Sequence, residues 1–421
     1  MNPFDKIIGY ESIRKELERT ADALKNPEYY SRIGVSAPCG LMLYGEPGLG
    51  KTLMAECLIE ASGRRSFVCR KNMPDGKFVN EIKRTFDLAK KEAPSIILLD
   101  DLDKFANDDD KHPDSEEYVT VQSCIDEMRG SGVFVLATAN KIFDLPRSLL
   151  RSGRFDRTIE VDPPNNDDAV RIVRHYLESK SCVEGIDADA VAGAMSGRSC
   201  ADLEAAVNKA GLLAGFERSE KITMRHLMLG CLDVAHDVSP DSIVAGKDDK
   251  AAVITAYHEA GHALVSETLF PGSVYAVCLF EAQNSTAGFT SYNMNDAPNL
   301  ENKLGIATRS LGGRAATMQK FGITDVGSSE DVLSAHRDLF DLTVSDAAFG
   351  FDLIDGMYET SGEILTRQHL FIASKMDECL NAAKRIVTEN AALLDAIAKE
   401  LLEKGLLTAR DVQRIKSGVP A

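Results

Sequence analysis

The chain has 421 residues, enough for two or three hydrophobic cores, and 44% hydrophobic and 27% charged residues are typical of a globular protein. Its formal net charge of −17 argues against nucleic acid and anionic membrane partners, because both require basic patches. No apolar run approaches the roughly 20 residues that span a bilayer. The nine cysteines form no C-x-x-C pair, which favours reduced thiols and a cytoplasmic location.

A buried strand is predicted at residues 40–44, followed by a glycine-rich loop and a helix from Leu53. The loop has the pattern G-x-x-x-x-G-K-[ST], whose backbone N–H groups and helix N-terminus bind phosphates. Lys51 is expected to reach the β- and γ-phosphates of ATP, and Thr52 to hold Mg²⁺. The alternative is a glycine-rich turn without a ligand. The predicted cofactor-binding residues are Gly45, Glu46, Pro47, Gly48, Leu49, Gly50, Lys51, Thr52 and Leu53, together with Asp100.

Two more buried strands are predicted at residues 95–101 and 133–140, and each ends in polar residues. Asp100 can contact the Mg²⁺ shell, and Asp101 stands where a water-activating carboxylate would be. Asn140 is suited to sensing the γ-phosphate or its attacking water. Strands that alternate with helices predict a parallel sheet with the nucleotide at its carboxyl edge.

Arginines follow at Arg151 and Arg154. Arginines near a nucleotide site are candidate fingers for the charge of the transition state. A surface salt-bridge cluster explains them equally well.

Turn-forming residues predict the domain boundaries. A Pro-Pro-Asn-Asn run ends a large nucleotide-binding subdomain at 1–164 and begins a helical subdomain at 165–236. Residues 237–249 form a predicted linker with Ser239-Pro240 and Gly246, and 250–421 form a second domain.

The second domain carries H-E-x-x-H at His258, Glu259 and His262 on a predicted helix. Residues four apart share one face of a helix, so the two imidazoles can bind one metal ion. Glu259 is placed to take a proton from a metal-bound water, whose pKa zinc lowers to about 7. This is the chemistry of peptide-bond hydrolysis; the alternatives are a solvated helix face or a satisfied pair in a core. Gly261 is expected to permit close packing beside the metal.

Zinc then needs a third protein ligand. One acidic stretch offers Asp325, Glu330, Asp331 and His336, and spacing alone does not choose among them. Short strands are predicted at residues 274–280 and 288–292. Their edge could pair with an extended substrate, or the two strands could form an ordinary hairpin. Helices are predicted from about residue 300.

The motifs GEPGLGKT, IILLDD, ATAN and RSGRFD, in this order, resemble the AAA+ ATPases. With AYHEAGHALV downstream, nearly the whole chain resembles the FtsH family of ATP-dependent zinc metalloproteases. The resemblance implies an α/β AAA+ module, with a parallel sheet, helices on both faces and a helical lid. A mostly α-helical, zincin-like metalloprotease domain would follow.

The resemblance also implies function. The family uses Zn²⁺, ATP and Mg²⁺ to unfold, translocate and degrade unfolded or misfolded proteins. The resemblance assigns Asp100 and Asp101 as the Walker B pair, Asn140 as sensor 1, and Asp331 as the third zinc ligand. Arg151 and Arg154 become fingers that act on the next subunit of a homohexameric ring.

The chain departs from the family at several positions. Asp101 replaces the usual glutamate, which predicts slowed but not abolished ATP hydrolysis. The substrate-gripping pore loop aligns with residues 72–76, which lack an aromatic residue and leave Met73, or failing that Phe78, as the grip. Thr317 replaces a common glutamate after the signature at 311–316, which we interpret as helix packing near the site.

Two questions stay open at this point. Family members usually carry N-terminal membrane spans, so this chain is either a naturally soluble member or a soluble piece of a longer protein. The rival functions are an AAA+ chaperone or remodelling ATPase with weak or ATP-independent proteolysis, and a peptidase that no longer needs its motor.

Overall fold

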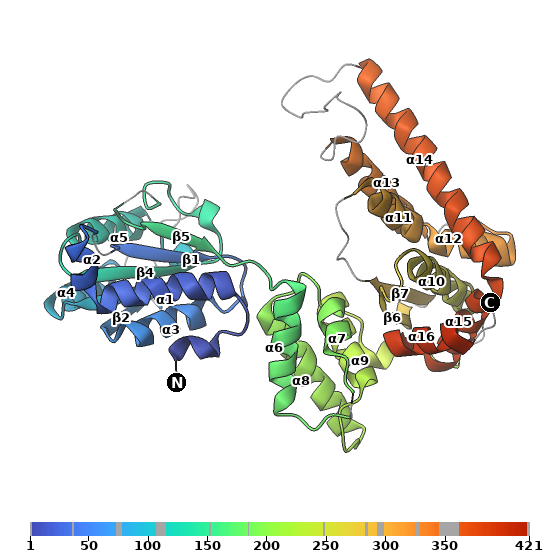
Figure 1. Ribbon diagram of the computed structural model, residues 1–421, viewed down its shortest axis with the longest axis horizontal. Coiled ribbons are helices and arrows are strands. Elements are labelled where there is room, and N and C mark those ends of the chain that lie inside the picture. The colour runs from blue at the N-terminus through green and yellow to red at the C-terminus, as the bar shows by residue number, and fades with distance from the viewer. Residues whose placement is uncertain are drawn as a thin grey trace. The chain divides into compact units, whose positions relative to one another are not determined.

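A computed structural model describes residues 2–35, 38–72, 78–106, 115–150, 153–183, 185–246, 249–282, 285–292, 299–324, 328–344 and 362–418. Contacts divide the chain into two compact units (Figure 1). The first comprises Met1–Glu178 and Gly197–Glu204, and the second Ser179–Ser196 and Ala205–Ala421. The sequence-based boundaries at residues 164, 236 and 249 remain a prediction.

A five-stranded parallel sheet forms the centre of the first unit. Its strand order is β2-β3-β4-β1-β5, and every neighbouring pair runs parallel. This arrangement confirms the predicted α/β class and brings the carboxyl ends of β1, β3 and β4 to one edge. The strands are β1 (Gly40–Tyr44), β2 (Arg65–Arg70), β3 (Ser95–Asp100), β4 (Val133–Ala139) and β5 (Arg157–Glu160).

Helices cover both faces of this sheet, because alternate strand residues point to opposite sides. Met42 packs into one core with α4 and α5, whereas Leu41 and Leu43 pack into another with α1 and α3. The helices of this unit are α1 (Glu11–Lys25), α2 (Pro27–Arg32), α3 (Lys51–Ser62), α4 (Val79–Lys91), α5 (Ser115–Glu127) and α6 (Asn166–Glu178).

The helix after the glycine-rich loop begins earlier than predicted. It starts at Lys51 instead of Leu53, and Gly50 precedes it with φ 86°. This left-handed conformation is accessible to glycine at little cost. The first N–H groups of α3 therefore belong to the loop that would bind phosphate.

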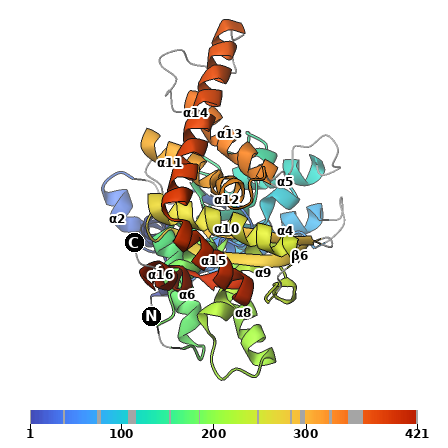
Figure 2. The same cartoon turned by 90° about the vertical axis from the view of Figure 1, so that its right-hand side faces the viewer.

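The second unit combines helices with a small antiparallel sheet of order β7-β6-β8. Helix α10 lies at its centre and packs against α12, α14 and α15 (Figure 2). The elements from this part of the chain are α7 (Ala188–Ala194), α8 (Cys200–Phe216), α9 (Met224–His236), α10 (Lys250–Leu269), β6 (Val274–Ala282), β7 (Ser285–Tyr292), α11 (Leu300–Ser310), α12 (Gly312–Phe321), α13 (Ser329–Val344), α14 (Gly362–Glu389), α15 (Ala391–Lys404), β8 (Leu406–Thr408) and α16 (Ala409–Gly418).

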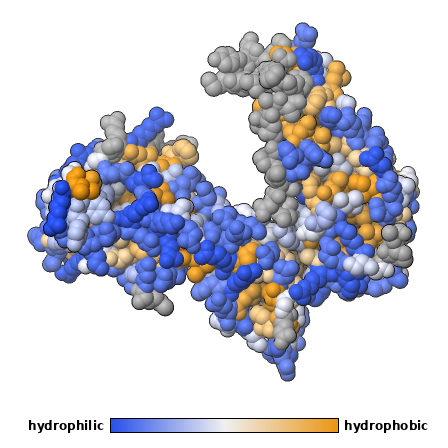
Figure 3. Space-filling view, in the orientation of Figure 1, coloured by the Kyte–Doolittle hydropathy of each residue, from blue (hydrophilic) through white to orange (hydrophobic). Residues whose placement is uncertain are grey.

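The sequence prediction of helices after residue 300 holds except for β8. This strand has three residues and pairs with the middle of β6. Hydrophilic side chains cover most of the visible surface of the described residues (Figure 3), as a chain with 27% charged residues requires. Across the described ranges, no helix combines the length and apolar character needed to cross a bilayer.

Candidate metal centre and nucleotide site

Helix α10 carries both histidines of the H-E-x-x-H motif. Asp249 begins the helix by accepting hydrogen bonds from the backbone N–H groups of Ala251 and Ala252, each at 3.0 Å. His258 and His262 follow on one face and are buried. Their Nε2 atoms lie 3.0 Å apart.

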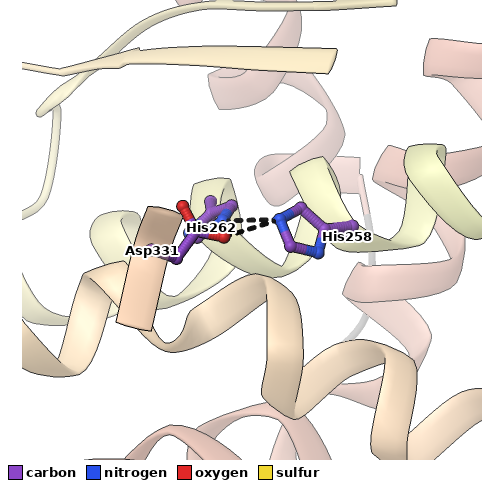
Figure 4. A group of neighbouring side chains, drawn as sticks. All are labelled: His258, His262 and Asp331. Carbon is purple, nitrogen blue, oxygen red and sulfur yellow. Dashed lines mark hydrogen bonds and ion pairs between the residues drawn. The ribbon is translucent and has the colours of Figure 1, made fainter. Parts of the chain in front are cut away.

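Asp331 reaches this pair from α13 (Figure 4). Its Oδ2 atom lies 3.0 Å from Nε2 of His258 and 3.3 Å from Nε2 of His262. Ligand atoms about 2.1 Å from a tetrahedral zinc stand about 3.4 Å apart, so these three atoms are close to one face of such a site and leave the fourth position open. Of the other candidates, Glu330 and His336 are exposed, and Asp325 lies outside the described residues.

Hydrogen bonding fixes the protonation of His262. Its Nδ1 lies 3.0 Å from the carbonyl oxygen of Arg309, which can only accept, so Nδ1 carries a proton and Nε2 is the nitrogen that can bind a metal ion. Burial lowers the pKa of His262, but the hydrogen bond and charge of Asp331 outweigh burial and raise it. Burial raises the pKa of Asp331, but both imidazoles outweigh it and lower the pKa, so the carboxylate is charged at neutral pH.

Glycines allow α12 to pack against the metal-binding helix. A Cβ on Gly261 would lie 2.5 Å from Cβ of Ala316 and from the carbonyl oxygen of Gly312. A Cβ on Gly313 would lie 2.5 Å from Nε2 of His258 and 2.6 Å from Nε2 of His262. These distances confirm the predicted close packing at Gly261 and the interpretation of the 311–316 signature as helix packing.

Glu259 is buried next to β7. Thr290 donates a hydrogen bond from its hydroxyl to Oε2 of Glu259 at 2.6 Å. A Cβ on Gly288 would lie 2.3 Å from Cγ of Glu259, so only glycine lets the strand pass this close. In the described sheet β7 pairs only with β6, which leaves its other edge for an extended chain.

The glycine-rich loop joins β1 to α3 at the carboxyl edge of the first sheet. Gly45 and Gly48 have φ angles of 145° and 82°, and a Cβ on Gly45 would lie 2.1 Å from the carbonyl oxygen of Val161. Lys51 is buried and donates hydrogen bonds to the carbonyl oxygens of Gly45 and Glu46, each at 2.7 Å. Burial lowers the pKa of Lys51, opposed by the charges of nearby aspartates.

Asp100, at the end of β3, is held by donors from several elements. Its Oδ1 accepts hydrogen bonds from Thr52 at 3.2 Å and from Thr138 at 2.7 Å, and Oδ2 accepts from Arg70. Burial raises the pKa of Asp100, but these hydrogen bonds outweigh burial and hold the pKa below its usual range. The pair formed by Thr52 and Asp100 is a suitable set of oxygen ligands for a Mg²⁺ shell.

Asn140 and Asp101 also reach this edge of the sheet. Oδ1 of Asn140 accepts a hydrogen bond from Nζ of Lys51 at 3.1 Å. Asp101 has φ 56°, and its Oδ2 pairs with Nζ of Lys104 at 2.6 Å. The structure therefore brings Lys51, Thr52, Asp100, Asp101 and Asn140 to one end of the sheet.

A cavity of about 400 Å³ lies beside the loop within the first unit. Tyr10 and Tyr176 line it, together with loop residues such as Gly48, Gly50 and Leu53. Aromatic and apolar walls next to a phosphate-binding loop suit a flat nucleotide base.

The two arginines are not equally placed. Arg154 donates hydrogen bonds to both carboxylate oxygens of Asp126, at 3.0 and 2.7 Å, and another to the carbonyl oxygen of Ser148. This intrachain pair corresponds to the salt-bridge alternative considered from the sequence. Arg151 lies outside the described residues.

The pore-loop prediction is corrected in part. Met73 and residues 74–77 lie outside the described residues. Phe78 is fully buried and its ring packs edge-on against Phe105 with centroids 5.3 Å apart. Phe78 therefore cannot grip a substrate, because it belongs to the core beneath α4.

Sequence reasoning missed several residues that support these sites. Thr138 lies in β4, two residues before Asn140, and its hydroxyl oxygen also accepts a hydrogen bond from the backbone N–H of Asp101 at 2.9 Å. The alternation of a buried strand would have pointed to it. No local sequence pattern pointed to Thr290 or Arg70, because each contacts a residue that only the fold brings near.

Comparison with known proteins agrees with this geometry. Residues 41–163 match the model of the ATPase family associated with various cellular activities (AAA). The chain is 30% identical to ATP-dependent zinc metalloprotease FtsH of Thermotoga maritima, covering 98% of this chain and 73% of that protein. It is 29% identical to FtsH 2 of Thermoanaerobacter sp. (strain X514), covering 98% and 82%. It is 29% identical to the YME1 homolog of Caenorhabditis elegans, covering 99% and 61%.

A parallel-sheet AAA module joined to a helical domain with a His-His-Asp cluster and a neighbouring glutamate defines the class of ATPase-linked metalloproteases. The identity extends through both halves of the chain, beyond the AAA module alone. The chain belongs to the FtsH family of ATP-dependent zinc metalloproteases.

Proposed function

We propose that the chain is an ATP-dependent zinc endopeptidase that unfolds, translocates and degrades proteins. The observation that carries the proposal is the convergence of three ligand atoms of His258, His262 and Asp331 within 4.8 Å of one another. Glu259 lies on the same helix, and the same chain carries a nucleotide-binding module.

In this proposal His258, His262 and Asp331 hold zinc, which supplies a Lewis acid for the scissile carbonyl and lowers the pKa of a water. Glu259 accepts the proton of the attacking water and donates it to the leaving amine. The hydrogen bond from Thr290 orients the carboxylate for both transfers.

ATP is proposed to bind along the loop from Gly45 to Leu53, with its base in the neighbouring cavity. Thr52 and Asp100 hold Mg²⁺, which neutralises charge on the phosphates. Lys51 exchanges its backbone carbonyl partners for phosphate oxygens. Asn140 senses the γ-phosphate, and Asp101 activates the water more slowly than a longer glutamate would.

We further propose a homohexameric ring in which Arg151 and Arg154 act on the next subunit. The intrachain pair with Asp126 means that Arg154 must be released before it can act in this way. The partners are unfolded or misfolded proteins and not nucleic acid, in keeping with the net charge of −17. Nine free cysteines support a reducing, cytoplasmic location. The proposed domains remain 1–164, 165–236, the linker 237–249, and 250–421.

The experiment that tests the function is degradation of unfolded casein by the purified chain. We expect degradation that requires ATP and is lost on chelation and in Glu259→Gln, with ATP hydrolysis retained in that variant. Casein that stays intact under all conditions while ATP is hydrolysed would instead support a remodelling ATPase. Proteolysis that survives in Lys51→Ala would show that the peptidase does not need its motor.

A further inference from the structure

Asp100 is paired with a cation that none of the sequence motifs contains. Arg70, the last residue of β2, donates to Oδ2 of Asp100 from Nε at 2.8 Å and also from Nη2. Arg70 and Asp100 are partners in the parallel register of β2 and β3. Residues paired in register point to the same face of a sheet, so the strand pairing itself fixes this contact.

The protein alone fills the hydrogen-bonding capacity of this carboxylate. A carboxylate has about four lone-pair sites, and Asp100 receives two donors from Arg70 and one each from Thr52 and Thr138. Asp100 is 1% exposed, and a buried carboxylate without a cation is costly. Arg70 neutralises it while its own side chain is 60% exposed. The guanidinium can therefore move into water without leaving a core.

We propose that Arg70 is a positioning residue that holds Asp100 in the nucleotide-free site and is displaced from Oδ2 when nucleotide binds with Mg²⁺. This inference rests on the proposed role of Asp100 in the Mg²⁺ shell. A guanidinium and a hard divalent cation compete for the same few oxygen lone pairs. Arg70 therefore raises the concentration of free Mg²⁺ at which nucleotide binds tightly.

Lys104 provides an internal comparison in the same site. Its Nζ lies 2.6 Å from Oδ2 of Asp101, and its side chain is 59% exposed. Removing Lys104 takes one positive charge from the same end of the sheet but does not free Asp100. The pair of variants thus separates direct competition at Asp100 from a general change of charge.

The experiment measures equilibrium binding of a fluorescent ADP analogue to the full chain while free Mg²⁺ is varied from micromolar to millimolar. We define the Mg²⁺ midpoint as the concentration of free Mg²⁺ at which binding of the analogue is half-maximal. In Arg70→Gln we expect this midpoint to fall about fivefold or more, the scale expected for losing a charge-assisted contact. In Lys104→Gln we expect a change of less than about twofold, since exposed pairs contribute little. In excess EDTA, Arg70→Gln should bind the analogue more weakly than the unmodified chain, because Asp100 then repels the phosphates.

Equal Mg²⁺ midpoints in Arg70→Gln and the unmodified chain would overturn the inference, as would equal shifts in Arg70→Gln and Lys104→Gln. If the affinity of the unmodified chain for nucleotide does not depend on Mg²⁺, the proposed metal role of Asp100 itself is overturned. This outcome is distinct from a failure of the inference about Arg70. Arg70→Lys keeps the positive charge but loses the planar guanidinium, which donates two hydrogen bonds to Asp100. It should move the midpoint in the same direction by a smaller factor, and it serves as the test if Arg70→Gln does not fold.

Discussion

Gly313 lies directly against the imidazole of His258. A Cβ at this position would stand 2.5 Å from Nε2, so the imidazole would have to move away from its place beside the metal site. The glycine of α12 therefore shapes the space in which the two α10 imidazoles can meet a metal ion.

We expect Gly313→Ala to lower bound zinc from about one per chain to less than about 0.2, because the new methyl group occupies the ligand side of both rings. Metal analysis of the purified variant measures this. The helical content should persist, since alanine favours a helix over glycine.

Gly215→Ala is the matched control for this substitution. Gly215 lies in α8, and a Cβ at this position would have no neighbour within 4 Å among the described residues. We expect full zinc content and a gain of about 0.5–1 kcal/mol in the free energy of unfolding. Normal zinc content in Gly313→Ala would contradict the packing argument.

Thr290→Val removes the hydroxyl that donates to Glu259 at 2.6 Å. A hydrogen bond to a charged group contributes about 1.5–3 kcal/mol, so we expect kcat for peptide cleavage to fall about tenfold or more with KM nearly unchanged. Thr290→Ser should restore most of the rate. Thr286→Val, on the same strand, is the control and should keep kcat within about twofold. A parallel loss in both valine variants would mean that β7 packing, and not the hydrogen bond, is responsible.

Asp101→Glu should accelerate ATP hydrolysis. The carboxylate of Asp101 is one methylene shorter than glutamate and is paired with Lys104 at 2.6 Å, so it is poorly placed to take a proton from water. General base catalysis contributes roughly 10²–10⁴-fold, and we expect recovery of about tenfold in kcat. Asp101→Asn should lower kcat below that of the unmodified chain. Steady-state ATPase assays at saturating MgATP decide this, and an unchanged or lower rate in Asp101→Glu would count against the proposed role.

Contacts between residues close together in the sequence could be predicted, whereas contacts between residues far apart in the sequence could not. His258 and His262 were predictable because a helix repeat fixes their relation within four residues. Asp331 lies 69 residues beyond His262, and only the family resemblance selected it from its neighbours. The pair of Arg70 and Asp100 depends on β2 lying beside β3, which no local pattern encodes.

Short or irregular features were predicted least well for the same reason. The strand β8 has three residues, and it is stabilised by pairing with β6 instead of by its own propensity. Phe78 was a plausible exposed grip from its position in the chain, but the core below α4 buries it. Burial of a single aromatic residue is decided by tertiary packing, which the sequence pattern around it did not reveal.

Asp411 predicts how stability of the second unit depends on pH. Burial raises the pKa of Asp411, but hydrogen bonds from Lys404 and from Thr408 outweigh burial and lower it to about 2. A carboxyl whose pKa is lower in the folded chain stabilises the fold above its unfolded pKa of about 3.9. This stabilisation is lost as the pH falls from about 4 through 2.

We therefore expect Asp411→Asn to lower the free energy of unfolding by about 1–2 kcal/mol at pH 7, after allowance for the partial exposure of the side chain. The difference between the variant and the unmodified chain should shrink as the pH falls from 4 towards 2, because the protonated aspartic acid has lost the same charge. Urea unfolding followed by a probe in the second unit measures both values. The exposed Asp241→Asn serves as the control and should change stability by less than about 0.5 kcal/mol at either pH. A difference for Asp411→Asn that stays constant across this range would show that its hydrogen-bond geometry, and not its charge, stabilises the first turn of α16.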